Sequence, residues 1–480
     1  MNKRMLGYLF GVLLSIEAAM LLLPMLVALL YREPVTPFLY TIAAIAVLAV
    51  PLLSLRPKRD RRLYAREGFV CAAGSWILLS LLGALPFVFS GAIPHYIDAV
   101  FETVSGFTTT GATILTEIES LPRGILFWRS FTHWVGGMGV LVFMMAILPA
   151  DNSRAMHLLR AEVPGPQKGK IVPKLRQSAL ILYGIYLVLT LAEVVALLIA
   201  RLPLYDAVVT ALGTAGTGGF GVKNASIAGY ASPAAEWIIA VFMLIFGINF
   251  NIYFFMLVGR VRDIFKNEEL RTYLIIVLAA TAVITLNTLS LFDGFGDALR
   301  AAFFQTTSVI STTGYVTENF DLWPSLSKIV LLCLMLFGAS AGSTAGGLKI
   351  SRVIILIKGG MRELRHILRP RSVNVTRLDG EALPDETVRT TGNYLIIYCA
   401  ILICGTLLVS IDGFSLESTF SAVLACLSNV GPGLGVVGPI GNFSVLSYFS
   451  KIVLSLIMLI GRLEIFPLLV FFMPSTWRRA

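Results

Sequence analysis

The stretch that decides the fold of this chain reads Asp98-Ala-Val-Phe-Glu-Thr-Val-Ser-Gly-Phe-Thr-Thr-Thr-Gly-Ala112. A short apolar or mixed segment is followed by a run of small or hydroxylated residues and then by Gly111. Three further stretches align with it without gaps and carry a glycine at the same place. They are Asp206-Ala-Val-Val-Thr-Ala-Leu-Gly-Thr-Ala-Gly-Thr-Gly-Gly-Phe220, Ala301-Ala-Phe-Phe-Gln-Thr-Thr-Ser-Val-Ile-Ser-Thr-Thr-Gly-Tyr315 and Ser418-Thr-Phe-Ser-Ala-Val-Leu-Ala-Cys-Leu-Ser-Asn-Val-Gly-Pro432. A repeat of this kind indicates a repeated structural unit.

A short helix followed by such a glycine has the chemistry of a cation site. The C-terminal end of a helix carries partial negative charge, which favours a nearby cation. Glycine allows the chain to turn back with positive φ and places no Cβ in the way. Four such loops around one axis would form rings of carbonyl oxygens that replace the hydration shell of a cation. The alternative is that these glycines are ordinary small-residue contacts between membrane helices, which does not explain four matched positions.

The composition is that of a membrane protein. The chain has 480 residues, of which 56% are hydrophobic and 14% charged, whereas soluble domains carry about 25% charged residues. Most of its long apolar runs reach the roughly 20 residues that a helix needs to cross a bilayer. These runs are Leu6–Leu30, Phe38–Leu55, Leu180–Ala200, Tyr273–Leu291, Ile329–Phe337, Tyr394–Ser410 and Ile452–Phe472. The first run is long for a cleaved signal peptide and a second run follows it, which favours a retained helix.

The distribution of basic residues predicts the topology. The net charge is +10, and the basic residues cluster between apolar runs, as the positive-inside bias requires, rather than in a pattern typical of nucleic-acid binding. The clusters are Lys3–Arg4, Arg56–Arg62, Arg154–Arg176, Arg260–Arg271, Arg352–Arg377 and Arg478–Arg479. If all of them are cytoplasmic, the chain makes five outward hairpins and both termini are inside. The last four hairpins each contain an extra segment that is too short to span, so we expect four re-entrant loops.

The four glycine-bearing loops resemble the filter loops of the Trk/Ktr/HKT superfamily of potassium transporters. The residues that carry the resemblance are Thr108-Thr-Thr-Gly-Ala112, Gly218-Gly-Phe220, Thr312-Thr-Gly-Tyr315 and Asn429-Val-Gly-Pro-Gly-Leu-Gly435. The wider chain is similar to the TrkH/TrkG-type potassium uptake subunits. The shared stretches are Arg66-Glu-Gly68, Trp134-Val-Gly-Gly-Met-Gly139, Arg160-Ala-Glu-Val-Pro-Gly-Pro166, Gly342-Ser-Thr-Ala-Gly-Gly-Leu-Lys349 and Gly461-Arg-Leu-Glu-Ile-Phe466. Two departures are Ala215-Gly-Thr before the second glycine pair and Tyr315 where Phe is common.

The resemblance implies an all-α polytopic membrane protein with about ten transmembrane helices. Four M1–P–M2 repeats, each a membrane helix, a pore helix with its loop and a second membrane helix, would surround a pore with pseudo-fourfold symmetry. The expected boundaries are an N-terminal two-helix hairpin at 1–62 and repeats at 63–172, 173–268, 269–385 and 386–480. The multi-pass chain would lie in the bacterial inner membrane.

The resemblance also implies the transported ion. A glycine in all four loops goes with potassium selectivity in this family, and a serine in the first loop goes with sodium transport, so Gly111 favours potassium. The implied potassium filter consists of Thr109, Thr110, Gly111, Gly218, Gly219, Thr312, Thr313, Gly314, Asn429, Val430 and Gly431.

A run of small residues interrupts the expected second helix of the third repeat. It comprises Gly338, Ala339, Ser340, Ala341, Gly342, Ser343, Thr344, Ala345, Gly346 and Gly347, with Lys349 just beyond it. Glycine disfavours a helix interior by about 1 kcal/mol relative to alanine, so a stiff helix is not expected. A tight helix–helix contact is one alternative; a phosphate-binding loop fails because Leu348 stands where its lysine belongs. The resemblance implies an intramembrane loop that closes the pore below the filter.

Arg462 lies inside the last apolar run. A charged arginine at the membrane centre is costly, so it should face protein or a wet cavity. The resemblance implies that it projects into the pore below the filter and repels cations. The alternative is a pairing with an acidic residue; Glu464 is an improbable partner along a helix because residues two apart do not share a face.

The expected function is potassium uptake through a gated, channel-like pore, with K⁺ as the transported ion and no organic cofactor on this chain. A symporter driven by sodium or protons is the alternative. An intramembrane enzyme, using Ser105 or His133, lacks a second catalytic member, and a receptor or scaffold would not need four filter loops.

The resemblance implies a homodimer in the lipid bilayer, no nucleic acid, and a cytosolic TrkA-type ring of RCK domains that binds ATP, ADP or NAD. We expect the basic segments Lys358–Arg389 and Arg154–Arg176 to dock this ring, unless they are simply positive-inside loops.

Overall fold

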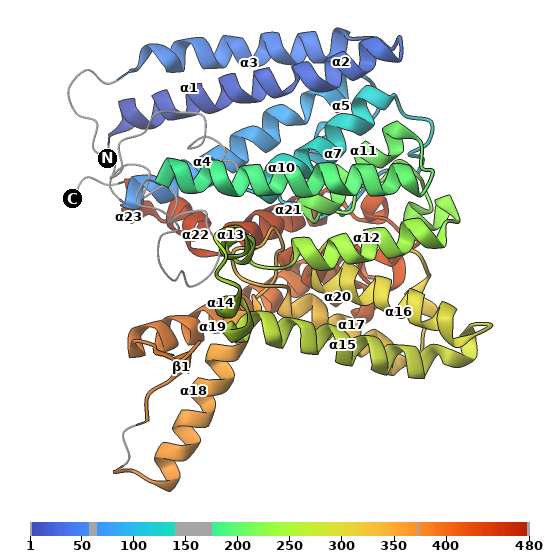
Figure 1. Cartoon of the computed structure of the whole chain (residues 1–480). Helices are drawn as coiled ribbons and strands as arrows, with labels where there is room; N and C mark the ends of the chain where they lie inside the picture. Colours follow the sequence, from blue (N-terminus) through green and yellow to red (C-terminus); the bar gives the residue numbers. More distant parts are fainter. Residues whose placement is uncertain (1, 57–64, 140–174, 372–373, 478–480) are drawn as a thin grey trace.

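The computed structural model describes residues 2–56, 65–139, 175–371 and 374–477, and within these ranges the chain is almost entirely helical (Figure 1). The strands in the described part form one small antiparallel hairpin of β1 (Arg377–Leu378) and β2 (Glu381–Ala382). Its turn residues Asp379 and Gly380 both have positive φ, 52° and 82°, as a tight two-residue hairpin turn requires.

The N-terminal part is the helical hairpin that the sequence predicts. It consists of α1 (Lys3–Met20), α2 (Leu22–Leu30) and α3 (Thr36–Ser54). Gly7 and Gly11 of α1 lie directly against the C-terminal end of α3, where Gly11 has no room for a Cβ beside the backbone of Leu53. Small residues at such a contact let two membrane helices approach closely.

Four long helices or helix pairs follow, one ahead of each glycine-bearing loop. They are α4 (Ala65–Gly83) with α5 (Leu85–Phe89), α10 (Leu175–Ile199), α15 (Glu268–Thr288) and α19 (Asp385–Val409). Large apolar side chains on the outside of these helices and of α3 are exposed, for example Val47 at 72%, Leu278 at 67% and Ile396 at 67%. Such continuous apolar surface is unusual for a soluble protein and suits contact with lipid.

Four shorter helices lead into the glycine-bearing loops, and we call them the pore helices. They are α6 (Tyr96–Phe107), α11 (Leu204–Gly216), α16 (Phe295–Ile310) and α20 (Leu416–Leu427). At 1.5 Å per residue they are about 18–24 Å long, short of the roughly 30 Å of hydrocarbon. They enter the bundle and do not cross it.

The helix after each loop is also short. These second helices are α7 (Arg123–Gly137), α12 (Pro233–Phe246), α17 (Ser325–Phe337) and α21 (Tyr448–Arg462). Three of them continue, after a break, as α13 (Phe250–Leu257), α18 (Ile350–Leu368) and α22 (Phe466–Phe472). The breaks are real changes of direction, since α12 and α13 meet at 89°.

The breaks explain how the described helices compare with the expected ten or so crossings. By length and composition six helices could span a membrane, or seven if α12 and α13 count as one bent span, among the described residues. The second helices fall short of this test because each ends or bends after 13–15 residues. The chain is a multi-span membrane protein in which the spans nearest the loops are interrupted.

The remaining elements are short and connect or end the longer ones. They are α14 (Val261–Lys266), α23 (Pro474–Trp477) and the 3-10 helices Ser226–Tyr230, Leu289–Leu291, Phe320–Leu322, Ser410–Asp412, Gly435–Val437 and Phe443–Val445. The start of α1 and α23 lie at the same end of the bundle, and α18 projects away from the bundle at that end (Figure 1).

Several helix starts are set by local sequence. Asn267 caps α15 by accepting a hydrogen bond from the Leu270 amide at 2.7 Å. Ser232 and Ser447 cap α12 and α21 in the same way, with acceptor distances of 3.4 and 3.2 Å. Side-chain caps of this kind satisfy amides that have no partner inside the helix.

Candidate cation pathway

The four pore helices end in the same backbone motif. We number the loops that follow them 1 to 4 in chain order, after Gly111, Gly219, Gly314 and Gly431. Two residues before each glycine stands a non-glycine residue in the left-handed region: Thr109, Thr217, Thr312 and Asn429, with φ of 55°, 55°, 58° and 56°. The amide of the next residue donates to the carbonyl five positions back, at 2.8–2.9 Å in all four loops. This is the Schellman type of helix end.

The motif places strain at four matched positions. A left-handed conformation at a residue other than glycine costs about 1–3 kcal/mol, and such residues persist where the surroundings hold them. The sequence predicted positive φ for the loop glycines, and Gly111, Gly219, Gly314 and Gly431 do have φ of 78°, 76°, 80° and 101°. The strained residues two positions earlier carry no glycine signal and were not predicted.

The loops close into a ring. A Cβ built on each glycine would come well within 3.0 Å of the carbonyl oxygen that precedes the glycine of a neighbouring loop. The contacts run from Gly111 to the Gly218 oxygen, from Gly219 to that of Thr313, from Gly314 to that of Val430, and from Gly431 to that of Thr110. Loop 1 therefore touches loop 2, loop 2 touches loop 3, loop 3 touches loop 4, and loop 4 returns to loop 1. All eleven predicted filter residues lie in this ring, buried or half-buried.

Polar side chains beside the loop glycines form hydrogen bonds between loops and within them. The Asn429 amide donates to the Thr110 hydroxyl at 2.9 Å and to the Met458 carbonyl at 3.0 Å. Thr108 and Thr110 share a hydrogen bond of 2.8 Å, and Ser311 and Thr313 share the equivalent bond of 2.7 Å. The loops themselves, residues 108–113, 216–221, 311–316 and 428–433, contain no carboxylate, histidine, lysine or arginine. Their ligand chemistry is that of carbonyl and hydroxyl oxygens.

The chain between α17 and α18 has no helix from Gly338 to Lys349, and we call residues 338–347 the 338–347 loop. Its backbone turns at Gly338, Gly342 and Gly347, with φ of 66°, 71° and 74°. It packs into the bend between α12 and α13, where the Ser340 amide donates to the Gly247 carbonyl at 3.1 Å. Lys349, with φ of 76° and 2% exposed, donates to the Ala345 carbonyl.

The side chains of Glu269 and Thr312 also tie the 338–347 loop and the start of α18 to their surroundings. The Glu269 carboxylate on α15 accepts from the Ala341 amide at 2.6 Å and from the Ser351 amide at 3.1 Å. The Gly346 amide donates to the hydroxyl of Thr312 at 2.7 Å. Thr312 is the strained residue of loop 3, so the 338–347 loop lies at the inner ends of the pore helices and is bonded directly to the ring.

Arg462, the last residue of α21, also binds the 338–347 loop. Its guanidinium donates to the Thr344 carbonyl at 2.8 Å, to the Gly137 carbonyl at 2.8 Å and to the Gly136 carbonyl. Gly136 and Gly137 end the helix after loop 1, and Thr344 follows the helix after loop 3. Arg462 therefore connects the end of the helix after loop 1 with the 338–347 loop.

Glu464 forms an ion pair with a residue of another helix. It lies 2.6 and 3.2 Å from the two terminal nitrogens of Arg352 on α18, and the Arg352 guanidinium also covers the Tyr394 ring at 4.0 Å. The sequence argument that Glu464 does not share a face with Arg462 agrees with this geometry, whereas its actual partner could not be read from the sequence.

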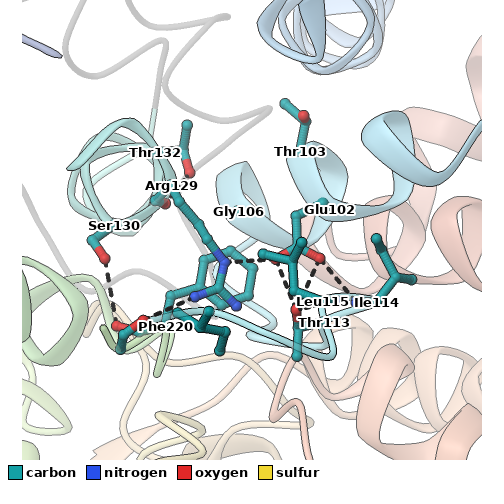
Figure 2. A network of polar contacts seen from close by, with 12 residues as sticks. Glu102, Thr103, Gly106, Thr113, Ile114, Leu115, Arg129, Ser130, Thr132 and Phe220 are labelled. Carbon is teal, nitrogen blue, oxygen red and sulfur yellow. Dashed lines mark hydrogen bonds and ion pairs between the residues drawn. The ribbon is translucent and has the colours of Figure 1, made fainter. Parts of the chain in front are cut away.

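A second buried ion pair was missed by sequence reasoning. Glu102 on α6 and Arg129 on α7 lie 2.6 Å apart behind loops 1 and 2, with side chains 0% and 2% exposed (Figure 2). The signal that could have found it is the cost of burying either charge alone in a membrane segment, which calls for a partner of opposite sign.

The basic segments expected to dock a partner are only partly described. The Arg154–Arg176 segment falls almost wholly within residues 140–174, outside the described part. Lys358–Arg389 begins on the projecting helix α18 (Figure 1). There Arg362 pairs with Asp385 and Glu363, and Arg365 and Arg369 are exposed.

Comparisons with known proteins agree over the whole chain. A family model described as "TrkH: Cation transport protein" matches residues 36–479. The Trk system potassium uptake protein TrkH of Salmonella typhimurium is 38% identical over 485 residues, and TrkG of Escherichia coli is 30% identical over 483 residues, with at least 99% of each chain covered. The crystal structure of the potassium transporter TrkH from Vibrio parahaemolyticus superposes with a TM-score of 0.90 at 34% identity and covers both chains fully.

Proposed function

Because the chain belongs to the TrkH family of cation transport proteins, we propose that it takes up potassium across the bacterial inner membrane through a selective, gated pore. The family is one of transporters and not of enzymes. The observation that carries the proposal is the closed ring of loops 1 to 4, in which each glycine abuts a carbonyl of the next loop. Relatives over the full length are named as potassium uptake proteins.

The ring supplies the ligand chemistry that a dehydrated potassium ion needs. Carbonyl and threonine oxygens can stand in for water, and the C-terminal ends of four pore helices add a favourable potential for a cation. In this proposal the filter is formed by the eleven residues of loops 1 to 4 that the sequence analysis names, the first being Thr109 and the last Gly431. Side chains at the four glycines would push neighbouring carbonyls apart, which is why glycine is needed there.

The gate, in this proposal, is the 338–347 loop together with Arg462 and Lys349. The loop fills space at the inner ends of the pore helices, and Arg462 adds a positive charge near the middle of the pathway. A unit charge about 4 Å from an ion is worth roughly 4 kcal/mol at an effective dielectric near 20, enough to slow a cation strongly. The hydrogen bond from Arg462 to Thr344 supports the view that charge and loop act as one device.

Regulation would come from outside the chain. A homodimer with both termini in the cytoplasm would present α18 and its basic residues to a cytosolic TrkA-type ring of RCK domains, which would bind ATP, ADP or NAD. The positions of α1, α18 and α23 at one end of the bundle support this arrangement (Figure 1). The Trk system name of the relatives fits a protein that works with partners.

Flux measurements in proteoliposomes test the proposal. Purified protein should carry potassium in preference to sodium down a potassium gradient, without a sodium or proton gradient. The alternative, a symporter, would need one of those gradients. The absence of acidic and basic side chains from the four loops favours the channel-like mechanism, since a proton relay needs titratable groups. Liposomes that carry no potassium under any gradient would contradict the function itself.

A further inference from the structure

The buried pair Glu102–Arg129 lies behind the ring and has no place in the filter or the gate described above. The two charges are 2.6 Å apart, and the carboxylate is fully buried (Figure 2). Burying two charges is expensive, and a pair of this kind repays the cost only when further hydrogen bonds satisfy both partners. Where those further bonds go therefore indicates what the pair does.

The bonds of Glu102 go to the segment that leaves loop 1. Its two carboxylate oxygens accept from the hydroxyl of Thr113 at 2.9 and 3.1 Å, and one of them accepts from the Ile114 amide at 3.0 Å (Figure 2). Thr113 and Ile114 come two and three residues after Gly111. The carboxylate thus ties the outgoing strand of loop 1 to its own pore helix.

The contacts of Arg129 go to the segment that leaves loop 2. Its guanidinium donates to the Gly221 carbonyl at 3.1 Å and lies over the Phe220 ring at 3.5 Å. The Phe220 carbonyl accepts in turn from the hydroxyl of Tyr315, which follows the glycine of loop 3, at 3.1 Å. The pair and its ligands therefore connect the outgoing strands of consecutive loops.

We call the Glu102–Arg129 pair and its hydrogen bonds the brace, and its acidic residue has no acidic counterpart in the other three stretches. The residue nine positions before the loop glycine is Glu102 in the first stretch, but Thr210, Gln305 and Ala422 in the others. An acidic residue therefore stands at this position in the first stretch alone. The uncharged counterparts make weaker links, such as the 3.3 Å bond from Gln305 to Thr317.

We propose that Glu102 and Arg129 are positioning residues that fix the separation of loops 1 and 2 and so set the discrimination between potassium and sodium. The inference rests on the proposed function, because it assigns selectivity to the ring. Neither side chain touches the ion in this account. They act by holding the segments that follow Gly111 and Gly219 in loops 1 and 2. When these segments are held less firmly, the carbonyl oxygens of the two loops can contract around the smaller sodium ion.

The test compares the potassium-to-sodium flux ratio of purified variants in proteoliposomes. Glu102→Gln and Arg129→Gln should each lower the ratio by about tenfold, since losing a charge-assisted bond in the brace is comparable to one decade in an equilibrium. The double variant should lower it by no more than either single one, because the two residues form one unit.

Asp98→Asn is the matched control. Asp98 is on the same pore helix and forms another ion pair, 2.7 Å from Lys451, with side chains 14% and 6% exposed, but it lies in the first turn of the helix and not at the end that meets the loop. This variant should keep the parental flux ratio even if it lowers the yield of folded protein. Equal losses of ratio in Asp98→Asn and Glu102→Gln would mean that the pair is merely structural and would overturn the inference.

The double variant keeps the test decisive if the single variants do not fold. Removing both charges together avoids leaving one of them buried without a partner, which is the more disruptive change. A monodisperse double variant with the parental ratio would refute the role proposed for the pair. If the parent itself fails to prefer potassium, the proposed function fails instead, so the two failures are distinguishable.

Discussion

Two left-handed residues in each loop set the geometry of the ring at the level of single side chains. Thr109 and Thr312 occupy a conformation that favours glycine, yet both keep a side chain. In loop 3 the reason is visible, since the hydroxyl of Thr312 accepts the Gly346 amide at 2.7 Å. The strained residue is therefore also the point where the ring meets the 338–347 loop, so a disturbance at one can be felt at the other.

Substitution of Gly111 tests the ring at its tightest contact. In Gly111→Ser a Cβ would overlap the Gly218 carbonyl, and the φ of 78° would be strained as well. Displacement of that carbonyl should raise sodium flux relative to potassium flux by about tenfold, equivalent to a change of about 1.4 kcal/mol. The ratio is measured in proteoliposomes with each ion in turn.

Gly91→Ser separates strain from overlap. Gly91 has a φ of 74°, but nothing lies within 4 Å of its Cβ position. It should leave the ion ratio unchanged. If Gly111→Ser behaves like Gly91→Ser, the ring does not form the selectivity filter.

Removal of the Arg462 charge tests the gate. Arg462→Ala loses the bonds to Thr344 and Gly137 and the positive charge they hold. Potassium flux without a partner should rise by about tenfold or more, given that a nearby charge is worth well over 1.4 kcal/mol, while the ion ratio stays the same. Arg300→Ala, which breaks a pair with Glu236 at 2.9 Å, is the control and should not raise the flux.

At the level of whole elements, the 338–347 loop is held by α15 as well as by the bend between α12 and α13. Glu269→Gln weakens the two bonds that its carboxylate accepts from Ala341 and Ser351. Potassium flux should increase severalfold at an unchanged ion ratio, because hydrogen bonds to a charged group contribute about 1.5–3 kcal/mol. Glu268→Gln is a close control, since Glu268 pairs with Lys358 and not with the loop.

Deletion within Ala339–Gly346 tests whether the 338–347 loop blocks potassium movement sterically. The shortened chain should conduct potassium faster than the parent and keep the ion ratio, since the ring is formed by other segments. Proteoliposome flux of folded, monodisperse protein is the measurement. If neither this deletion nor Glu269→Gln speeds potassium flux, the barrier lies elsewhere in the pathway.

The elements also show what sequence reasoning reaches. The N-terminal hairpin and the loop glycines could be predicted from the sequence, because the length of apolar runs and the spacing of glycines are local properties of the chain. The breaks of α12 at Gly247 and of α21 after Arg462 were missed, since neither carries a run of glycines like Gly338–Gly347. Arg129, the ion-pair partner of Glu102, lies 27 positions away in sequence, and the partners of Glu269 lie 72 and 82 positions away, so only the folded packing brings them together.

In the molecule as a whole, α18 projects away from the helical bundle in the described part of the chain (Figure 1). Its outer turns carry Arg362, Arg365 and Arg369, and a helix with basic residues outside the bilayer suits an acidic protein surface. If the proposed cytosolic RCK ring docks there, reversing these three charges to glutamate should reduce co-purification with it by about tenfold or more, since repulsion replaces attraction at each site. Potassium flux without the ring should be unchanged, because none of the three residues touches the loops.

A matched control for the docking role of α18 uses the basic residues of α14 (Val261–Lys266). Arg262→Glu with Lys266→Glu reverses two exposed charges on a different helix and should leave co-purification intact if α18 is the docking element. Intact co-purification of the α18 triple variant would contradict the docking role of this helix, and its basic residues would then act only as orientation signals. Loss of co-purification in both variants would mean that the RCK partner responds to total positive charge, so the α18 surface would not be a specific docking site. The expected pattern, loss in the α18 variant alone, would link a partner to the 338–347 loop, which ends just before this helix, and through Gly346 and Thr312 to the ring of four loops.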